Sequence, residues 1–469
     1  MATPASGAPS RSASLHLVLL LAALSLLALP ATASADRARV QSLGGVDLLM
    51  EDDSNIFINP AHVGQYSNRV WFSLGVTGSG GAIGFDPLGG GTVQIRRLLN
   101  LGVVLNRSPL QYGFDKAIWP VAEAYIPGGP GGTLSGPDGP AEPTAPLRFP
   151  VDLFVSYGNR DTPLRFGVNV YYAGGVQRNW EVEDNDQDRI DDQQVQKLHS
   201  HLVNVTLGVA GGRSTDRIRP EGWLRVGLLT AWSDEQGFRG EDPTLDRILS
   251  LDRDLRVGVG GRVHIGDPTT LRGVVVSPAI LCDIAGGAIR FDDNRVNPDS
   301  DAEQMIRRAF GHSVSLGVGV SGRVDELRVV GTAAVNIDAL NVFDQTNGSG
   351  SDIDQVTSDA WDLAVPDLSI GAEYNILPAL IVRGGIRSTV GAGRAITTNK
   401  TFEGPEDDAF QLDVNQTIAN RPVALGFEAN GGVGIRVRRF SLDATLGGLF
   451  FGQGQASFLS RVDMSFSFD

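Results

Sequence analysis

The sequence is poor in the residues that staple, ligate or catalyse. Cys282 is the only cysteine among 469 residues, so no intramolecular disulfide can form. Only six histidines occur, and none stands in a serine or cysteine nucleophile motif; a phosphate-binding glycine loop is also missing. These absences argue against an enzyme, and we expect a protein without catalytic activity and without a resident cofactor.

Long apolar runs are equally scarce. After residue 35, no stretch approaches the roughly 20 consecutive apolar residues that a spanning helix needs. The mature chain is therefore either soluble or crosses a membrane as a closed β-barrel, since lipid leaves no other way to satisfy the backbone. The net charge of −15 argues against nucleic acid as a partner. The 59 glycines suit a curved sheet with crowded inward side chains.

The N-terminus has the pattern of a secretory signal. Arg11 precedes an apolar run, Leu15–Leu29, and Ala33, Ser34 and Ala35 supply small residues for cleavage. Residues 1–35 are therefore predicted to be a cleaved signal peptide, with the mature chain starting at Asp36.

The last stretch, Phe458–Asp469, alternates with a period of two. Its apolar set is Val462, Met464, Phe466 and Phe468, and its polar set is Arg461, Asp463, Ser465 and Ser467. A period of two places the two sets on opposite faces of a strand. The segment resembles the closing strand of bacterial outer-membrane barrels, whose terminal aromatic residue is read by the barrel assembly machinery. Asp469 after that aromatic departs from the pattern.

The same alternation recurs along the chain. It predicts strands at Arg69–Thr77, Thr92–Arg96, Asn100–Arg107, Arg148–Tyr157, Leu164–Tyr172, Leu198–Ala210, Trp223–Trp232, Asp254–Ile265, Thr269–Ile284, His312–Val324, Leu327–Ala339, Asp362–Tyr374, Leu380–Val390, Val423–Arg438 and Phe440–Phe450, before the closing strand.

Connection lengths also alternate. Tight turns such as Asp325–Glu326 and Arg438–Arg439 alternate with long connections, which we predict to be loops at 108–147, 177–197, 233–251, 286–310, 341–360 and 393–421. Outer-membrane barrels have short turns at one end, long loops at the other and an even strand number. Residues 69–469 are therefore predicted to form an all-β transmembrane antiparallel barrel of about 16 strands (14–18) in the bacterial outer membrane, surrounded by its lipid.

The polar phase of these strands predicts the residues that face the lumen. Charges of both signs mix there, which favours a lattice of cross-strand ion pairs and leaves a polar permeation path as the alternative. The predicted lumen charges are Arg148, Asp152, Arg256, Glu428, Arg436, Asp443, Arg461 and Asp463, joined by Arg165, Arg225, Asp254, Arg262 and Arg328.

Residues 36–68 precede the first strand and do not alternate. They contain an apolar run, Ile56, Phe57 and Ile58, followed by Asn59, Pro60 and Ala61. Asn starts a turn and Pro fixes φ, so the apolar run is predicted to fold back against the inner wall as a gate. This Asn-Pro-Ala start resembles the hatch of FadL-type transporters, which implies passage of fatty acids or aromatic hydrocarbons. The family's usual Gly after this motif is His62 here. A plain tether before the first strand is the alternative reading.

An acidic stretch, Glu183–Asp192, has oxygen ligands at spacings that suit calcium. The tentative ligands are Asp184, Asp186, Asp188, the Ile190 carbonyl and Asp192. Arg189 replaces the turn glycine and Val195 replaces the bidentate acid, so at most weak calcium binding is expected; a solvated acidic loop is the alternative. His199 and His201 share one strand face nearby, without an evident third metal ligand, and are interpreted as interfacial residues.

Three functions fit these patterns. The first is outer-membrane passage of small hydrophobic molecules, with the 36–68 segment as a plug. The second is a general diffusion porin for small hydrophilic solutes, which the charged lumen phase favours. The third is a structural or secretion-platform barrel without transport, which the Pro/Gly-rich segment 108–147 favours. In the first two readings the partner is a small-molecule solute. The sequence does not predict an oligomeric state.

Overall fold

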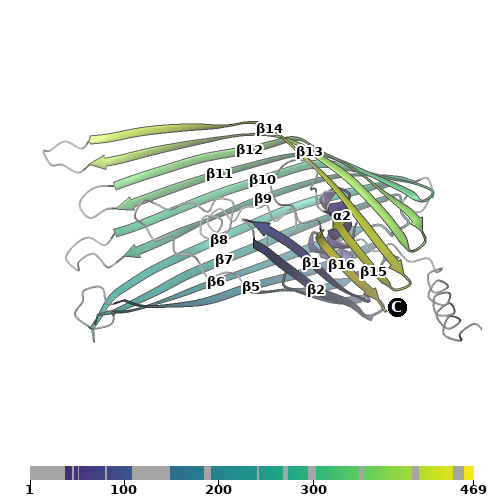
Figure 1. Cartoon of the computed structure of the whole chain (residues 1–469), viewed down its shortest axis with the longest axis horizontal. Helices are drawn as coiled ribbons and strands as arrows, with labels where there is room; N and C mark the ends of the chain where they lie inside the picture. The colour runs from purple at the N-terminus through teal and green to yellow at the C-terminus, as the bar shows by residue number, and fades with distance from the viewer. Residues whose placement is uncertain are drawn as a thin grey trace, which may run out of the picture.

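The computed structural model describes residues 37–44, 47–50, 52–79, 82–107, 148–183, 192–239, 242–267, 273–293, 303–347, 353–403, 411–446 and 459–468. The predicted signal peptide and the 108–147 segment lie outside these residues. Within them the chain forms a closed antiparallel barrel of sixteen strands (Figure 1), which confirms the predicted fold class.

Each predicted strand has its counterpart in the barrel. The bounds are β1 Arg69–Ser79, β2 Ala82–Arg96, β3 Leu99–Leu105, β4 Arg148–Tyr157, β5 Leu164–Glu183, β6 Asp192–Gly211, β7 Ile218–Arg239, β8 Asp242–Gly266, β9 Val274–Asp293, β10 Glu303–Val324, β11 Leu327–Asn347, β12 Ile353–Leu377, β13 Leu380–Glu403, β14 Gln411–Val437, β15 Phe440–Leu446 and β16 Leu459–Ser467.

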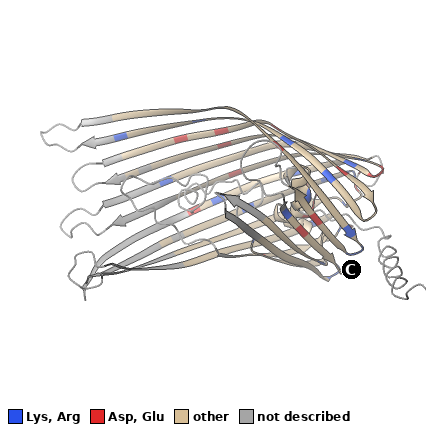
Figure 2. Cartoon of the chain, viewed as in Figure 1, with Lys and Arg blue, Asp and Glu red and all other residues tan. Residues whose placement is uncertain are grey.

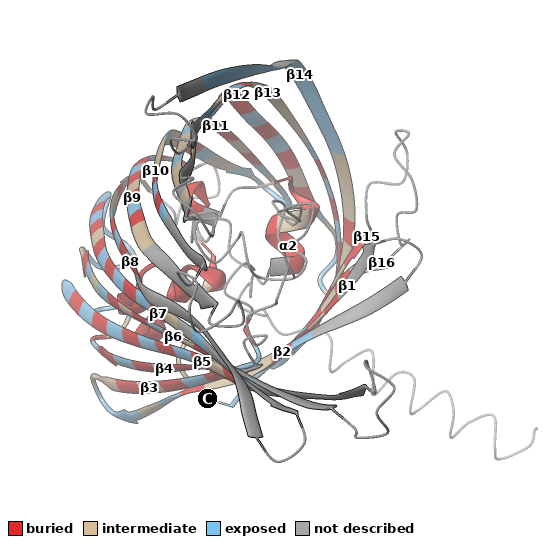
Figure 3. Cartoon of the chain, turned by 90° about the vertical axis from the view of Figure 1, so that its left-hand side faces the viewer, coloured by how far each residue is buried: buried red, intermediate tan, exposed pale blue. Residues whose placement is uncertain are grey.

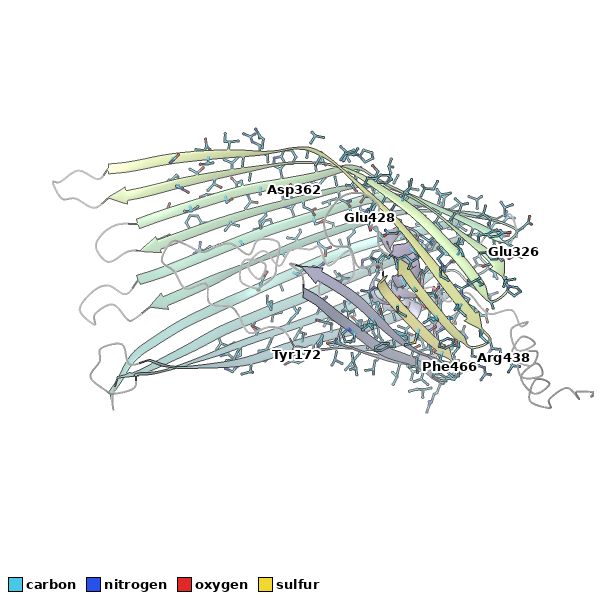
Figure 4. The ribbon with its side chains drawn as sticks, viewed as in Figure 1. Tyr172, Glu326, Asp362, Glu428, Arg438 and Phe466 are labelled. Carbon is cyan, nitrogen blue, oxygen red and sulfur yellow. The ribbon has the colours of Figure 1, made fainter. Side chains whose placement is uncertain are left out.

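The ladder closes between the first strand and the last. Arg69 in β1 lies opposite Ser467 in β16, and the register continues to Gly75 opposite Arg461. Every other neighbouring pair in the barrel is consecutive in sequence. This up-and-down order keeps the tight turns at one end, the turn end, where Figure 4 labels Glu326, Arg438 and Phe466.

The predicted loops were wrong in their extent. Residues 177–183 and 192–197 are paired strand, from Gln177 opposite Leu198 to Glu183 opposite Asp192. Likewise, β8 and β12 each run for 25 residues and β14 for 27, although about 9–11 residues cross a membrane. Above the lipid neither face has to be apolar, so the alternation that signals a strand is lost there although the backbone ladder continues.

The strands differ greatly in height. β5 to β14 have 20 to 27 residues, whereas β3 and β15 have seven each. Figure 1 accordingly shows a tall, curved wall beside a low one formed by β1, β2, β15 and β16.

Burial alternates along the strands, as the stripes in Figure 3 show. On β5 the outward series Leu164, Phe166, Val168 and Val170 is exposed, while the inward Arg165 and Asn169 are buried. Because the outward set is aliphatic and aromatic around the ring of strands, this face is the one that contacts lipid. The barrel therefore spans a membrane.

An N-terminal segment occupies the turn half of the bore. It comprises the helix α2 (Arg37–Ser42) and three 3-10 turns, η1 (Asp47–Leu49), η2 (Asp53–Phe57) and η3 (Pro60–Gln65). We call residues 37–66 the inner segment. Figure 1 shows α2 inside the barrel near the turn end. Among the described residues, no helix has the length and apolarity to cross a membrane.

The orientation of the wall predicts a position-dependent effect of charge. Val259 lies in the middle of the exposed outward series of β8 between Leu255 and Ile265. We expect Val259→Arg to destabilise the barrel by about 2–4 kcal/mol and Ile265→Arg, beside the turn, by about 0–1 kcal/mol. Urea titration of the refolded protein in phospholipid vesicles measures both values. Equal costs at the two positions would contradict the assigned membrane level.

Candidate functional site

The apolar run of the inner segment is buried against the wall. Ile56, Phe57 and Val63 cluster with Leu88, Val104 and Phe154 of β2, β3 and β4. The Phe57 and Phe154 rings meet edge to face with centroids 5.7 Å apart. Ile58 packs on the other side, with Leu48, Leu49, Trp223, Ala279 and Leu281. The apolar run Ile56–Ile58, which we call the apolar wedge, therefore fills the space between β2–β4 and β7–β9.

The Asn-Pro-Ala motif both turns the chain and ties it to the wall. Asn59 caps η3, because its Oδ1 accepts a hydrogen bond from the Ala61 N–H at 3.1 Å, with Pro60 as the first residue of the turn. The Asn59 Nδ2 donates to the Val209 carbonyl and to Glu221 Oε2, each at 3.1 Å. A buried turn thus has its polar side chain satisfied on both atoms.

Opposed glycines in the wall receive the backbone of the inner segment. Gly167 of β5 and Gly208 of β6 are register partners, and a Cβ on either would collide with Asn59 or Pro60. Gly371 and Gly385 are also partners. A Cβ on either of these would collide with the backbone of Leu43.

A third place where glycines receive the inner segment, which we call a docking point like the other two, is formed by two glycines of one strand. Gly317 and Gly319 of β10 face Leu49, and a Cβ at Gly319 would collide with the Leu49 carbonyl. At these three places the wall has glycine. The absence of a Cβ lets the backbone of the inner segment approach the sheet closely.

One carboxylate gathers donors from the inner segment and from the wall. Glu221 of β7 is hydrogen-bonded to His62 Nε2 and receives Arg262 Nε, while His264 Nε2 lies 3.0 Å from its Oε1. The Gln65 side-chain amide nitrogen donates to His62 Nδ1 at 2.9 Å, and its oxygen accepts from Arg165. All of these side chains are buried. A buried carboxylate is costly unless donors surround it in this way, so His62 of the inner segment helps to satisfy Glu221 of the wall.

A second network holds α2. Arg39 Nε donates to Glu373 Oε2 at 2.7 Å and Arg39 Nη2 donates to Oε1 at 3.1 Å. Arg383 joins the same Glu373 to Asp443. Burial, the largest single influence, lowers the pKa of Arg39, but the charges of Glu373, Asp52 and Asp443 and the hydrogen bond to Glu373 together outweigh it and raise this pKa above its ordinary value. The guanidinium is therefore permanently charged and paired.

Backbone groups of the inner segment are also satisfied by wall side chains. Arg262 Nη1 donates to the Leu48 carbonyl at 2.6 Å and to the Met50 carbonyl at 3.1 Å, and its Nη2 donates to Asn55 Oδ1 at 2.9 Å. Asp463 accepts from the Ala38 N–H at 2.6 Å. One arginine thus ties η1 to η2, and the closing strand holds α2.

The predicted lumen charges face inward, mostly in pairs. Asp152 accepts Arg107 Nε at 2.6 Å, and Arg256 Nη2 lies 3.2 Å from Asp283. Glu428 is exposed, yet its register partner Arg387, which pairs with the buried Asp367, sets it on the lumen face. Figure 2 shows charged positions around α2 at this end. The other buried ones are Arg165, Arg225, Asp254, Arg262, Arg436, Asp443, Arg461 and Asp463; the side chain of Arg148 lies outside the description.

Most of the predicted calcium ligands cannot be placed relative to this site. Residues 184–190 lie outside the described chain, and Asp192 is the first residue of β6. Calcium binding there stays a prediction. Among the described residues, no three side chains of His, Cys, Asp or Glu are grouped to hold a metal ion.

A cavity remains beside the apolar wedge. It lies between Ile56, Phe57 and Tyr66 of the inner segment and Trp71 and Leu88 of the wall, with a volume of about 50 Å³. Asp53, Arg69, Ser73 and Asp463 add polar groups at its edge. The surface available to a ligand is therefore mainly aromatic and aliphatic, with few groups for hydrogen bonds.

The sequence did not indicate which charged residues of the wall hold the inner segment. Glu221, Glu373 and Arg383 are single charges in alternating strands, and nothing in the local pattern separates them from other lumen charges. The glycines that contact the inner segment could have been recognised from the sequence. Two glycines that oppose each other across a predicted ladder indicate that another backbone approaches the sheet there.

The docking glycines predict how the inner segment can be loosened. Gly385→Ala should strain its contact with Leu43 by about 1–3 kcal/mol, as overpacking does. Gly384→Ala is the matched control, because its outward Cβ would have 4.0 Å of clearance. We expect trypsin to cleave at Arg39 roughly 5- to 150-fold faster in the first variant and at the parental rate in the second. Equal cleavage of the two variants would mean that the segment does not depend on this docking point.

Comparisons with known proteins give likenesses of fold only. No protein-family model matches the chain, and no curated protein matches it in sequence. Among solved structures, the Ralstonia pickettii toluene transporter TbuX is 12% identical, with 93% of this chain and 99% of that one covered and a TM-score of 0.35. The Pseudomonas putida toluene transporter TodX is 11% identical, with coverages of 93% and 97% and a TM-score of 0.32. The Acinetobacter baumannii siderophore receptor PiuA is 8% identical, with coverages of 86% and 82% and a TM-score of 0.32. At these values the likenesses carry no argument about function.

Proposed function

We propose that the protein passes small hydrophobic molecules across the outer membrane, with the inner segment as a gate whose core is Ile56–Ala61. The observation that carries the proposal is the cavity between the inner segment and the wall, which is lined by Phe57, Tyr66, Trp71 and Leu88. Pockets for small apolar ligands are built in this way, with aromatic walls and few polar groups.

The size of the cavity indicates why a gate has to move. Its volume is about 50 Å³, whereas an apolar cavity that takes up benzene measures about 150 Å³. A ligand of that size therefore enters only if side chains of the inner segment give way. Since Phe57 and Tyr66 belong to the inner segment and Trp71 and Leu88 to fixed strands, displacement of the segment is what enlarges the cavity.

The charges of the turn half favour this function over a general porin. Glu221, Glu373 and Asp443 are buried and bonded to arginines or histidines, two of which, Arg39 and His62, belong to the inner segment. Paired charges of this kind hold the segment in the bore, whereas a porin needs its charges to face a water path. The structural-platform alternative depends on residues 108–147, outside the described chain.

Deleting the gate tests the proposal directly. Removal of Ser54–Tyr66 takes away the wedge and the His62 contact but no strand, so the barrel is expected to fold, as heat-modifiable gel mobility will show. Single-channel conductance should rise from near silence to a steady open level, while selective uptake of apolar compounds is lost. A parent protein that already conducts steadily, or a deletion that changes neither property, would refute the gate.

The cavity is tested without opening the bore. Leu88→Trp should fill it, because Leu88 is buried at its wall. We expect binding of a fluorescent apolar probe to weaken about tenfold or more, the effect of losing roughly 1.4 kcal/mol, with conductance unchanged. Leu105→Trp on β3 is the control, since Leu105 is 53% exposed on the lipid face. Unaltered probe binding in Leu88→Trp would remove the cavity from the transport path.

A further inference from the structure

Four rings from three strands form a patch on the outward face, away from the bore. They are Tyr172 of β5, His199 and His201 of β6, and Trp232 of β7; we call them the ring patch. His199 stacks on Trp232 with centroids 4.8 Å apart and planes 9° apart. His201 lies 5.4 Å from the same indole and 6.2 Å from the Tyr172 ring. The rings therefore form a continuous stack.

The ring patch depends on a glycine, which leaves room for the contact between Tyr172 and His201. Tyr172 reaches along its own strand so that its hydroxyl lies 3.0 Å from His201 Nδ1. Gly174 lies beneath this contact as the register partner of His201, and a Cβ there would stand 2.5 Å from the tyrosine hydroxyl. The Tyr172 contact fixes the orientation of the His201 ring and leaves its Nε2 for another partner.

The ring patch lies near the upper end of the apolar band, where the exposed Val176 is the register partner of His199. Toward the turn end it is followed by Val170, Val203 and Leu228, all exposed to lipid, with Thr230 between Leu228 and Trp232. Figure 4 shows Tyr172 on the wall well away from the turn end. In the opposite direction the ladder continues with Arg178 opposite Lys197. Apolar wall, aromatic and imidazole rings, and basic positions thus follow one another along β5 and β6.

This order matches the order of groups in a membrane lipid with a phosphorylated headgroup. Acyl chains lie against aliphatic side chains, amphipathic rings sit at the interface, and cations attract the phosphate. His199 forms no hydrogen bond within the described part of the chain, so both of its ring nitrogens are open to a ligand. We propose that the ring patch binds the phosphate group of an outer-leaflet lipid through the imidazole N–H groups of His199 and His201.

The role of each residue follows from its place. Trp232 supports both imidazoles, Tyr172 orients His201, and the backbone register brings Arg178 and Lys197 to the next level outward. The proposal is independent of the gate, because the ring patch and the inner segment lie on opposite faces of the wall.

Native mass spectrometry of the full barrel in detergent with EDTA, using diphosphoryl lipid A as the probe, measures this binding. The parent should retain the lipid, and the double variant His199→Phe with His201→Phe, which keeps stacked rings but has no ring N–H, should bind it about tenfold more weakly or worse, because two hydrogen bonds to a charged group are lost. Tyr172→Phe, which keeps the ring, should give a smaller loss. These substitutions are on the surface, and heat-modifiable mobility verifies folding.

The control is His312→Phe. His312 is an imidazole beside Phe310 on the outward face of β10, without a second histidine or a tryptophan next to it. It should bind lipid A as the parent does. Equal binding by the double variant would overturn the proposal, as would equal retention of dephosphorylated lipid A. Displacement of the lipid by an equimolar amount of inorganic phosphate would likewise overturn it, since the site would then recognise a free anion.

Discussion

The structure depends first on the need to satisfy every backbone hydrogen-bonding group that meets lipid. An unpaired N–H or C=O in hydrocarbon costs several kcal/mol, so a membrane-spanning sheet has to close on itself. Here closure is made by Arg69–Gly75 against Arg461–Ser467, the first strand against the last. Because sixteen strands run up and down without a crossover, the first strand begins at the turn end, where the last strand finishes. The inner segment, which precedes the first strand, therefore enters the bore from that end.

The inner segment is held by a combination that neither apolar packing nor charge would provide alone. Opposed glycines let its backbone lie against the sheet, and buried arginines then reach its carbonyl groups, as Arg262 does with Leu48 and Met50. Carboxylates such as Glu221 and Glu373 would be costly in a dry interior but become favourable when donors surround them. The proposed gate movement depends on the same arrangement, since water entering the bore can solvate these groups once the segment leaves.

The inward and outward faces of the wall carry different chemistry. Inside, charges of both signs pair across strands around the inner segment; outside, aliphatic residues give way to rings at Tyr172 and Trp232. Since side chains alternate between the two faces, one strand can line the bore on one side and contact lipid on the other. The uneven strand heights add a second asymmetry, with a tall wall from β5 to β14 beside a low wall.

The sequence by itself determined the barrel, its strand number and the facing of most charges, because a period of two over many segments and alternating connection lengths have few other solutions. It failed where those constraints end. Residues such as Gln177 and Asn420 continue the strands above the lipid without an alternating pattern, because no solvent difference enforces one. Only the tertiary structure decided which glycines face the inner segment and which charges share a partner. Gly385 and Gly384 are neighbours in sequence with the same local pattern, yet Leu43, more than three hundred residues earlier, distinguishes them.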